Sequence, residues 1–278
     1  MKKENKSVIK YSAALAVLCL LIPILCGCGA KKAESESFLE HSVPAAYENL
    51  DNTKIGWGLK KEKGVSPQVP AKLTEVLKKY SAVYIDESGE KNMYLTFDEG
   101  YENGYSAKIL DVLKATDTPA AFFITGDYIK TSPELVKRMH DEGFVVGNHT
   151  NHHPSMPDID DNKIKDEIES LNKMYNELTG DNMSFFRPPK GEYSERTLAV
   201  TNELGYKTVL WSFAYADWEK NNVKGANYAY DSVTPYFHDG AILLLHAVSK
   251  DNADALESII NEAKNQGYTF KSLNDLKN

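Results

Sequence analysis

From residue 94 onward, short apolar runs alternate with stretches in which apolar residues recur every three or four positions. Short apolar runs are typical of buried strands, and a period near 3.6 is typical of helices that face a core. The pattern predicts strands at 94–97, 120–125, 144–147, 185–187, 208–211, 241–245 and 268–270, and helices near 104–115, 132–142, 161–179 and 253–266, with a further helix between Ser194 and Gly205. Repeated strand-then-helix units predict an α/β fold with a parallel sheet, and this many units predict a closed or nearly closed barrel.

Two of the predicted helices carry end signals. Ser132 is expected as an N-cap with Pro133 at the first helical position, and Gly143 follows the end of that helix. Ser194 and Gly205 play the same two roles for the later helix. These signals fix where the loops of the barrel begin.

Composition divides the chain into four segments. Residues 1–28 are interpreted as a leader, and the polar residues 29–54, which lack sustained periodicity, as a tether. Residues 55–93 contain Ile55-Gly-Trp-Gly58 and an amphipathic stretch at 71–80, and are expected to form an N-terminal appendage. The main domain is predicted to cover 94–276.

The leader has the layout of a secretion signal. Its charged start contains four lysines, Lys2, Lys3, Lys6 and Lys10. An apolar stretch at 11–25 follows and ends in Leu25-Cys-Gly-Cys28, which resembles a bacterial lipobox with Cys28 as the acylated residue. An uncleaved signal anchor is the alternative, although the apolar run is shorter than a full membrane span. Both interpretations place the rest of the chain outside the cytoplasmic membrane, and the lipoprotein would sit on the outer face of that membrane.

Cysteine usage and charge exclude several classes of function. The only cysteines, Cys19, Cys26 and Cys28, lie in the leader, so the exported domain has no disulfide and no thiolate chemistry. The formal charge is −8, and removing the leader, with its four lysines and one glutamate (+3), leaves −11. Such a balance argues against a basic groove for nucleic acid.

Two adjacent carboxylates, Asp98 and Glu99, follow directly on the apolar run at 94–97. Two acids where a buried strand ends cost free energy unless a cation or a hydrogen-bonding partner holds them. Taken alone, such a pair is more often a polar turn. Three further polar clusters, each at the end of its own apolar run, favour a functional site, because the chemistry of such barrels lies at the carboxyl ends of the strands.

The first of these clusters is His149-Thr-Asn-His-His153. Two imidazoles four residues apart can ligate one metal ion from a single turn, although this spacing is more often incidental. Glu99 would complete a set of two histidines and one carboxylate with open positions for water and substrate. His152 lies between the pair and is expected to point elsewhere.

The second cluster, Arg187-Pro-Pro-Lys-Gly191, follows the short run at 185–186. Arg187 can either pair with a surface acid or hold Asp98 ionised in one orientation. The rigid Pro-Pro would present the backbone N–H of Lys190 or Gly191 to a developing oxyanion.

The third cluster joins Tyr215-Ala-Asp217-Trp218 to His246, which ends the apolar run at 241–245. A buried, satisfied histidine is the alternative. If Asp217 accepts the ring N–H of His246, the pKa of the histidine rises and it becomes a general acid near neutrality. Tyr101 and Trp218 lie near these motifs and suit sugar rings, although most aromatic side chains pack in cores or at rims.

These motifs carry a family resemblance. Thr96-Phe-Asp-Glu-Gly100, His149-Thr-Asn-His-His153, Arg187-Pro-Pro-Lys-Gly191, Asp217-Trp218 and Leu245-His246 resemble, in order and rough spacing, the five motifs of NodB-type polysaccharide deacetylases, carbohydrate esterase family 4. Tyr101-Glu-Asn-Gly104, Gly56-Trp-Gly58 and the segments 245–253 and 267–273 are similar to the PdaA-type branch, the δ-lactam-biosynthetic de-N-acetylases of the spore cortex. The resemblance covers about residues 55–276.

The resemblance implies a fold, a reaction and partners. The fold is a distorted (β/α) barrel of the NodB type, and the reaction is hydrolytic removal of the acetyl group from N-acetylmuramic acid in peptidoglycan. The implied substrate has already lost its stem peptide to an amidase. The freed amine can then close on the lactyl carboxyl group and give muramic δ-lactam, a cortex marker recognised during germination.

The resemblance also implies roles for single residues. It makes Asp98 the general base, His246 the general acid, Arg187 the group that orients Asp98, and Asp217 the partner of His246. The ligands of a divalent metal, zinc by expectation, are Glu99, His149 and His153. The residues implied to contact substrate are Tyr101, Lys190, Gly191 and Trp218. The sequence departs from the family pattern twice: Glu99 stands where an aspartate is usual, and Lys190 stands where a tyrosine is common.

Two other functions stay open at this point. One is a general deacetylase of N-acetylglucosamine in peptidoglycan or chitooligosaccharides. The other is a membrane-tethered glycan-binding protein with an inactive site, for which Glu99 is the only support.

Overall fold

The computed structural model describes residues 47–276 of the chain. The predicted leader with Cys28 and most of the predicted tether lie outside these residues. Within the described range, no helix is both long enough and apolar enough to cross a membrane.

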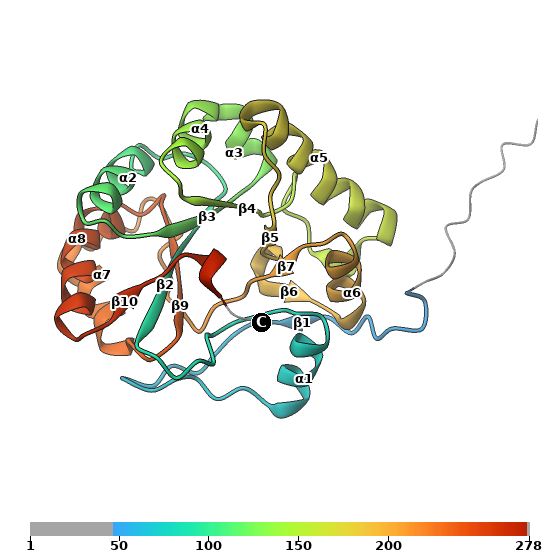
Figure 1. Cartoon of the computed structure of the whole chain (residues 1–278), viewed down its shortest axis with the longest axis horizontal. Coiled ribbons are helices and arrows are strands. Elements are labelled where there is room, and N and C mark those ends of the chain that lie inside the picture. Colours follow the sequence, from blue (N-terminus) through green and yellow to red (C-terminus); the bar gives the residue numbers. More distant parts are fainter. Residues whose placement is uncertain (1–46, 277–278) are drawn as a thin grey trace, which may run out of the picture. The chain divides into compact units, whose positions relative to one another are not determined.

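A curled parallel sheet forms the centre of the fold (Figure 1). Its strands run in the order β7 (Lys207–Thr208), β5 (Phe185–Phe186), β4 (Val145–Asn148), β3 (Ala120–Ile124), β2 (Asn92–Glu99), β9 (Ala241–His246) and β8 (Phe213–Ala214), and β10 (Thr269–Phe270) pairs with the start of β2. Every pairing within this sheet is parallel. Among the described strands β7 and β8 do not pair with each other, so the barrel is distorted and open, and the predicted α/β barrel is confirmed.

Helices surround the outside of this sheet (Figure 1). They are α2 (Ser106–Ala115), α3 (Gly126–Thr131), α4 (Pro133–Asp141), α5 (Asp161–Thr179), α6 (Glu195–Glu203), α7 (Ala226–Val233) and α8 (Lys250–Asn265). Apolar side chains of these helices enter one hydrophobic cluster with those of the strands; in α2, Ile109, Leu110 and Leu113 are all fully buried. Ser194 caps α6 through a capping box with Thr197, as the sequence predicts.

The two faces of the central strands enter different hydrophobic clusters. Leu95 and Phe97 of β2 face the surrounding helices. Tyr94, on the opposite face, packs inside the barrel with Phe123 and with Leu273 from the C-terminal segment. Because successive side chains of a strand point to opposite faces, a residue's parity decides whether it reaches the barrel interior.

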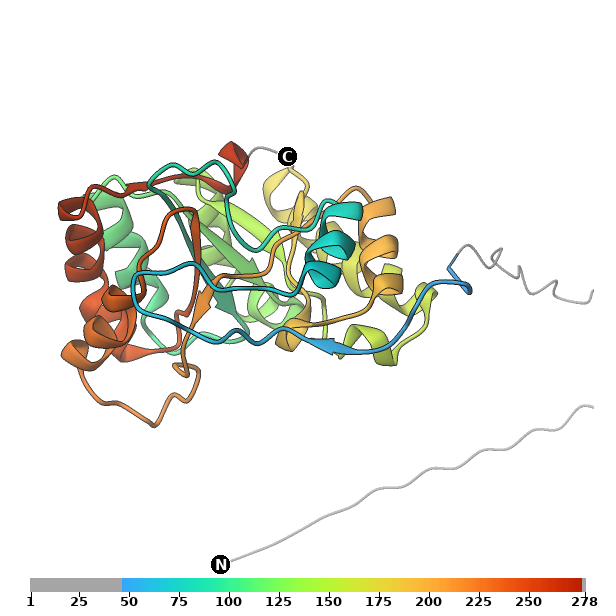
Figure 2. The same ribbon diagram turned by 90° about the horizontal axis from the view of Figure 1, so that it is seen from below.

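The N-terminal appendage packs against one side of the barrel. Its strand β1 (Ile55–Gly56) pairs antiparallel with β6 (Glu192–Tyr193), and its helix α1 (Ala71–Lys79) lies beside α6 in both views (Figure 1, Figure 2). Trp57 donates from its backbone N–H to the carbonyl of Gly191 (2.9 Å) and from its indole to the carbonyl of Trp211 (2.8 Å). The appendage thereby reaches the loops at the carboxyl end of the sheet.

The structure shifts two predicted boundaries. Residues 47–54 were assigned to the tether, yet Tyr47 is buried in the core and Asn52 donates to the carbonyl of Pro157 (3.0 Å), so these residues belong to the folded part. The appendage was predicted to end at residue 93, but β2 already begins at Asn92. Both boundaries are set by contacts between residues far apart in the sequence and not by local composition.

Several short elements differ from the sequence pattern. The helices α3 and α7 and the strands β1, β6 and β8 were not predicted. The run 208–211 was predicted as one strand, but β7 ends at Thr208. Beyond it Val209 forms an isolated bridge with Val83, and the carbonyl groups of Val209 and Leu210 accept hydrogen bonds from the side chain of Arg187.

Candidate active site

The carboxyl ends of β2 and β9 bring two predicted catalytic residues together. Asp98 and His246 occupy paired positions in the parallel register of these strands, so their side chains lie next to each other on the inner face. A cavity of about 650 Å³ opens at this edge. It is lined by Asp98, His149, His153 and His246, together with the predicted substrate contacts Tyr101, Lys190, Gly191 and Trp218.

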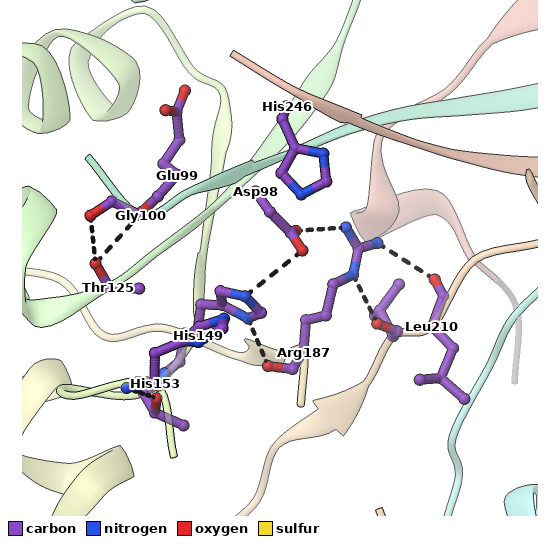
Figure 3. Close-up of polar contacts among 12 residues, drawn as sticks. Asp98, Glu99, Gly100, Thr125, His149, His153, Arg187, Leu210 and His246 are labelled. Carbon is purple, nitrogen blue, oxygen red and sulfur yellow. Dashed lines mark hydrogen bonds and ion pairs between the residues drawn. The ribbon is translucent and has the colours of Figure 1, made fainter. Parts of the chain in front are cut away.

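Asp98 is held in one orientation by a buried arginine (Figure 3). Arg187 donates from Nη1 to Oδ1 of Asp98 (2.8 Å), and its other nitrogens donate to the carbonyls of Val209 (3.0 Å) and Leu210 (3.2 Å). The guanidinium also stacks 4.1 Å from the ring centre of Phe123. Because each of its three nitrogens donates a hydrogen bond, Arg187 is fixed in place, and Asp98 keeps its second oxygen for the cavity.

The environment keeps Asp98 ionised. Burial raises the pKa of this carboxyl group, but the positive charge of Arg187 and the nearby His149 and His246 outweigh burial, so the pKa is lowered from its ordinary value. A carboxylate that stays ionised at neutral pH can accept a proton from water. This is the property that a general base needs.

The loop after β4 turns two imidazoles towards the same cavity. Thr150 (φ 68°) and His153 (φ 57°) both adopt left-handed backbone conformations, which non-glycine residues rarely take. The rings of His149 and His153 lie with their centres 4.9 Å apart. His152 points elsewhere, as the sequence predicts, and its Nδ1 pairs with Glu167 (2.8 Å).

The hydrogen bonds of His149 fix its tautomer. Its Nδ1 lies 2.8 Å from the carbonyl of Arg187, which only accepts, so Nδ1 carries the proton and Nε2 presents a lone pair. That Nε2 lies 3.5 Å from Oδ2 of Asp98 (Figure 3). Burial lowers the pKa of His149, and burial together with His149 lowers the pKa of His153 to about 4, so both rings are neutral at pH 7.

This donor set suits a divalent cation only in part. Two neutral imidazoles beside a carboxylate oxygen are the ligand type that zinc prefers, so His149 and His153, with Asp98 beside them, would hold such a cation. The expected third ligand does not take part. Within residues 47–276 no three His, Cys, Asp or Glu side chains are arranged as a metal-binding group.

Glu99 corrects the prediction from the sequence. It is the residue after Asp98 in an extended strand, so its side chain points to the helix-facing side of β2, away from the histidines (Figure 3). There its Oε1 accepts from the hydroxyl of Ser106 (3.4 Å), and its Oε2 has no hydrogen-bond partner among the described residues. Burial, and then the charge of Glu102, raise the pKa of Glu99 well above its ordinary value.

His246 is supported from behind by a carboxylate. Its Nδ1 lies 2.7 Å from Oδ1 of Asp217, and its backbone N–H donates to Oδ2 of the same residue (2.8 Å). Burial lowers the pKa of His246, but the charge and hydrogen bond of Asp217 outweigh burial, so the pKa is raised. The ring therefore holds a proton at higher pH than a free histidine and turns Nε2 to the cavity, as a general acid requires.

The rim of the cavity carries the remaining predicted residues. Tyr101 and Trp218 are 44% and 53% exposed, so their rings are open to a bound glycan. The backbone N–H of Gly191 already donates to the carbonyl of Pro188 (3.1 Å), which makes it unsuitable as an oxyanion donor. The N–H of Lys190 therefore remains the candidate from this loop.

The sequence did not predict three residues of the site. Trp57 and Trp211 line the cavity, and Asn252 donates to Oδ2 of Asp217 and to the carbonyl of His246 (3.1 Å). Trp57 and Asn252 lie in Gly56-Trp-Gly58 and in the segment 245–253, which resemble family segments. The sequence therefore marked both residues but assigned neither of them a function in the site. Trp211 stands in a run that was assigned to a buried strand.

Comparisons with known proteins agree with this geometry. A family model described as polysaccharide deacetylase matches residues 86–209. The chain is 48% identical to the peptidoglycan-N-acetylmuramic acid deacetylase PdaA of Bacillus subtilis, over 84% of this chain and 89% of that relative. The solved structure of Bacillus subtilis PdaA, a family 4 carbohydrate esterase, matches with a TM-score of 0.80 and 47% identity over 82% of this chain and 98% of that one. The chain belongs to carbohydrate esterase family 4.

A further relative is more distant in sequence. A peptidoglycan-N-acetylglucosamine deacetylase of Bacillus cereus is 31% identical over 71% of this chain and 72% of its own length. The family predicted from the five motifs is therefore confirmed, and the chain is a polysaccharide deacetylase, a hydrolase, by membership.

Proposed function

We propose that this protein hydrolyses the acetamide of N-acetylmuramic acid in peptidoglycan from which the stem peptide has been removed. The observation that carries the proposal is the convergence of Asp98, His149, His153 and His246 on one cavity, with Arg187 and Asp217 behind them. The 48% identity to a relative named peptidoglycan-N-acetylmuramic acid deacetylase supports muramic acid as the substrate.

The roles of the side chains follow from their charge states. Asp98, ionised and fixed by Arg187, takes a proton from the attacking water, whose oxygen bonds to the carbonyl carbon. The N–H of Lys190 donates to the oxyanion that develops there. His246, protonated through Asp217, gives its proton to the nitrogen as the C–N bond breaks, which leaves acetate and a free amine.

A metal ion has a limited place in this proposal. His149 and His153 would hold a divalent cation, zinc by expectation, and the cation would polarise the carbonyl group and lower the pKa of water. Because Glu99 lies on the other face of β2, we expect weaker metal binding than in a site with three protein ligands. Glu99→Gln should leave metal affinity unchanged in equilibrium dialysis, whereas His149→Ala should abolish it.

The cellular setting is also a proposal. A freed amine beside a lactyl carboxyl group can close to muramic δ-lactam, as expected in spore cortex, and an amidase must act first to expose that carboxyl group. Cys28 would anchor the protein as a lipoprotein on the outer face of the cytoplasmic membrane. Cys28→Ala should release the protein from the membrane fraction, and continued membrane attachment of this variant would favour an uncleaved signal anchor.

The test is mass spectrometry of glycan after incubation with the protein, with and without chelator. We expect loss of an acetyl group from muramic acid in peptide-stripped glycan, and slower loss with chelator. Equal deacetylation of glucosamine, or of peptide-bearing glycan, would favour the general deacetylase instead. Glycan binding without acetate release under any divalent metal would favour an inactive binding protein.

A further inference from the structure

The charged groups of the cavity have an unusual balance. Asp98 is its only acidic lining residue, and Arg187 pairs with it, whereas two lysines, Lys61 and Lys190, line the wall. The chain as a whole carries a formal charge of −8. A cavity with surplus positive charge in an acidic protein favours a substrate that brings a negative charge of its own.

The two lysines are not equivalent. Nζ of Lys61 donates to the carbonyl of Ala214 (3.0 Å) and lies 5.2 Å from the ring centre of Phe213, so it is engaged within the protein. Lys190 takes part in none of the ion pairs or side-chain hydrogen bonds found between residues 47 and 276. Asp158, an acid that its charge reaches, is already bonded to Lys54. Lys190 therefore has a charge available for a ligand.

At the cavity, Lys190 has a backbone conformation that is unfavourable for a lysine. Its φ of 59° and ψ of 7° lie in the left-handed region, where glycine is the usual residue. The preceding Pro188 and Pro189 fix the approach of the chain, and Gly191 follows with a φ of 65°. Conformational strain of this kind is concentrated at functional positions, which indicates that the side chain of Lys190 has a role.

The position of Lys190 relative to the reacting groups decides what it can bind. Lys190 lines the same cavity as Asp98 and His153. In muramic acid the lactyl ether is on C3, adjacent to the C2 carbon that bears the acetamide. A cation beside the acetamide site is therefore placed to meet a carboxylate on the neighbouring carbon.

We propose that Nζ of Lys190 binds the free lactyl carboxylate of muramic acid and so selects peptide-free muramic acid. Glucosamine has only a hydroxyl group at C3, and muramic acid with a stem peptide has a neutral amide in place of the carboxylate. Both alternatives would leave the ammonium group without a charged partner. This proposal rests on the proposed function and adds the residue that determines its specificity.

The experiment compares two substrates that differ only in this charge. Peptide-stripped glycan fragments are used with the lactyl carboxylate free or converted to its neutral methylamide, and acetate release is followed at several concentrations. The wild-type kcat/KM should be about tenfold to a hundredfold higher for the acid, the range of a charge-assisted hydrogen bond. Lys190→Gln should remove this preference by raising KM for the acid towards the value for the methylamide.

Three variants separate charge from structure. Lys190→Arg should retain most of the preference, because it keeps the positive charge. Lys190→Gly should lose the preference although glycine fits the left-handed backbone without strain, which excludes misfolding as the cause. Lys72→Gln, an exposed lysine of α1 outside the cavity, should behave like the wild type.

Each other outcome contradicts the proposal in a recognisable way. Equal wild-type rates on acid and methylamide would overturn the role of Lys190 while leaving muramic acid deacetylation intact. An equal loss on both substrates in Lys190→Gln would show a general structural effect and would also overturn it. If the wild type releases acetate from chitooligosaccharides but from neither muramic substrate, the proposed function falls together with this inference.

Discussion

Asp98 and Glu99 are neighbours in one strand, yet their carboxyl groups have opposite environments. Both are buried, with 7% and 0% of their surface exposed. On the inner face Asp98 meets Arg187 and two histidines, and its pKa is lowered. On the outer face Glu99 meets Ser106 and the charge of Glu102, and its pKa is raised well above the ordinary value.

The difference shows that burial alone does not determine the protonation of a carboxyl group. Desolvation raises the pKa of both acids, and the partner on each face decides the net result. The pleat of β2 assigns these partners, because it sends successive side chains to opposite sides. The inner face thus has an ionised carboxylate, and the outer face has a carboxylic acid that is favoured in its neutral form.

The largest expected effect concerns the residue paired with Asp98 across the strands. His246→Gln should lower kcat by about 10²–10⁴-fold, because the leaving amine loses its proton donor. Acetate release measured under saturating substrate checks this, with circular dichroism to show that the fold is kept. A variant with more than half of the wild-type kcat would remove His246 from the chemistry.

The second effect concerns Arg187, the cationic partner that Asp98 has and Glu99 lacks. Arg187→Met should cost about 3–5 kcal/mol of unfolding free energy, because it leaves the carboxylate of Asp98 buried without its cation. Arg138→Met is the control, since Arg138 pairs with Asp111 at the surface and should cost about 1 kcal/mol or less. Equal losses in urea denaturation of the two variants would contradict the importance of the inner pair.

The third effect is a shift in pH dependence. Asp217 raises the pKa of His246, so His246 keeps its proton, and the enzyme its acid, to higher pH. Asp217→Asn should therefore move the alkaline limb of the kcat/KM profile to lower pH and reduce the rate at pH 8 most. Asp254→Asn, a change at a surface ion pair, should leave the profile in place. An unshifted alkaline limb in Asp217→Asn would mean that another group sets it.

The smallest effect belongs to the outer face. The folded-state pKa of Glu99 lies above its unfolded value of about 4.3, so the folded chain binds the extra proton, and stability falls as pH rises through the folded pKa. Glu99→Gln removes this titration and should stabilise the protein by about 1–3 kcal/mol at pH 8 but not at pH 4. Thermal unfolding at both pH values measures it, and an equal change at the two would contradict a buried neutral acid.

Local sequence signals predicted much of this fold and part of this site. Caps and periodicity gave the bounds of α5 and α6 because both helices are determined by local residues. The short α7 has no side-chain cap on Gly225, and no such local signal marked it. The convergence of Asp98, His149 and His246 was predictable, because each follows the end of a predicted strand. The direction of the Glu99 side chain depended instead on its alternation with Asp98 along β2. The hydrogen bond from Asn252 to Asp217 joins residues 35 positions apart, so no local signal marked it.

The most direct test of the whole account is acetate release from peptide-stripped glycan by the wild type, Asp98→Asn and Glu99→Gln, assayed side by side. Asp98→Asn should lose about 10²–10⁴-fold in rate, while Glu99→Gln should stay within about threefold of the wild type, since only the inner carboxylate reaches the cavity. If Glu99→Gln loses as much activity as Asp98→Asn, the separation of the two faces is wrong, and both carboxylates must serve the same site.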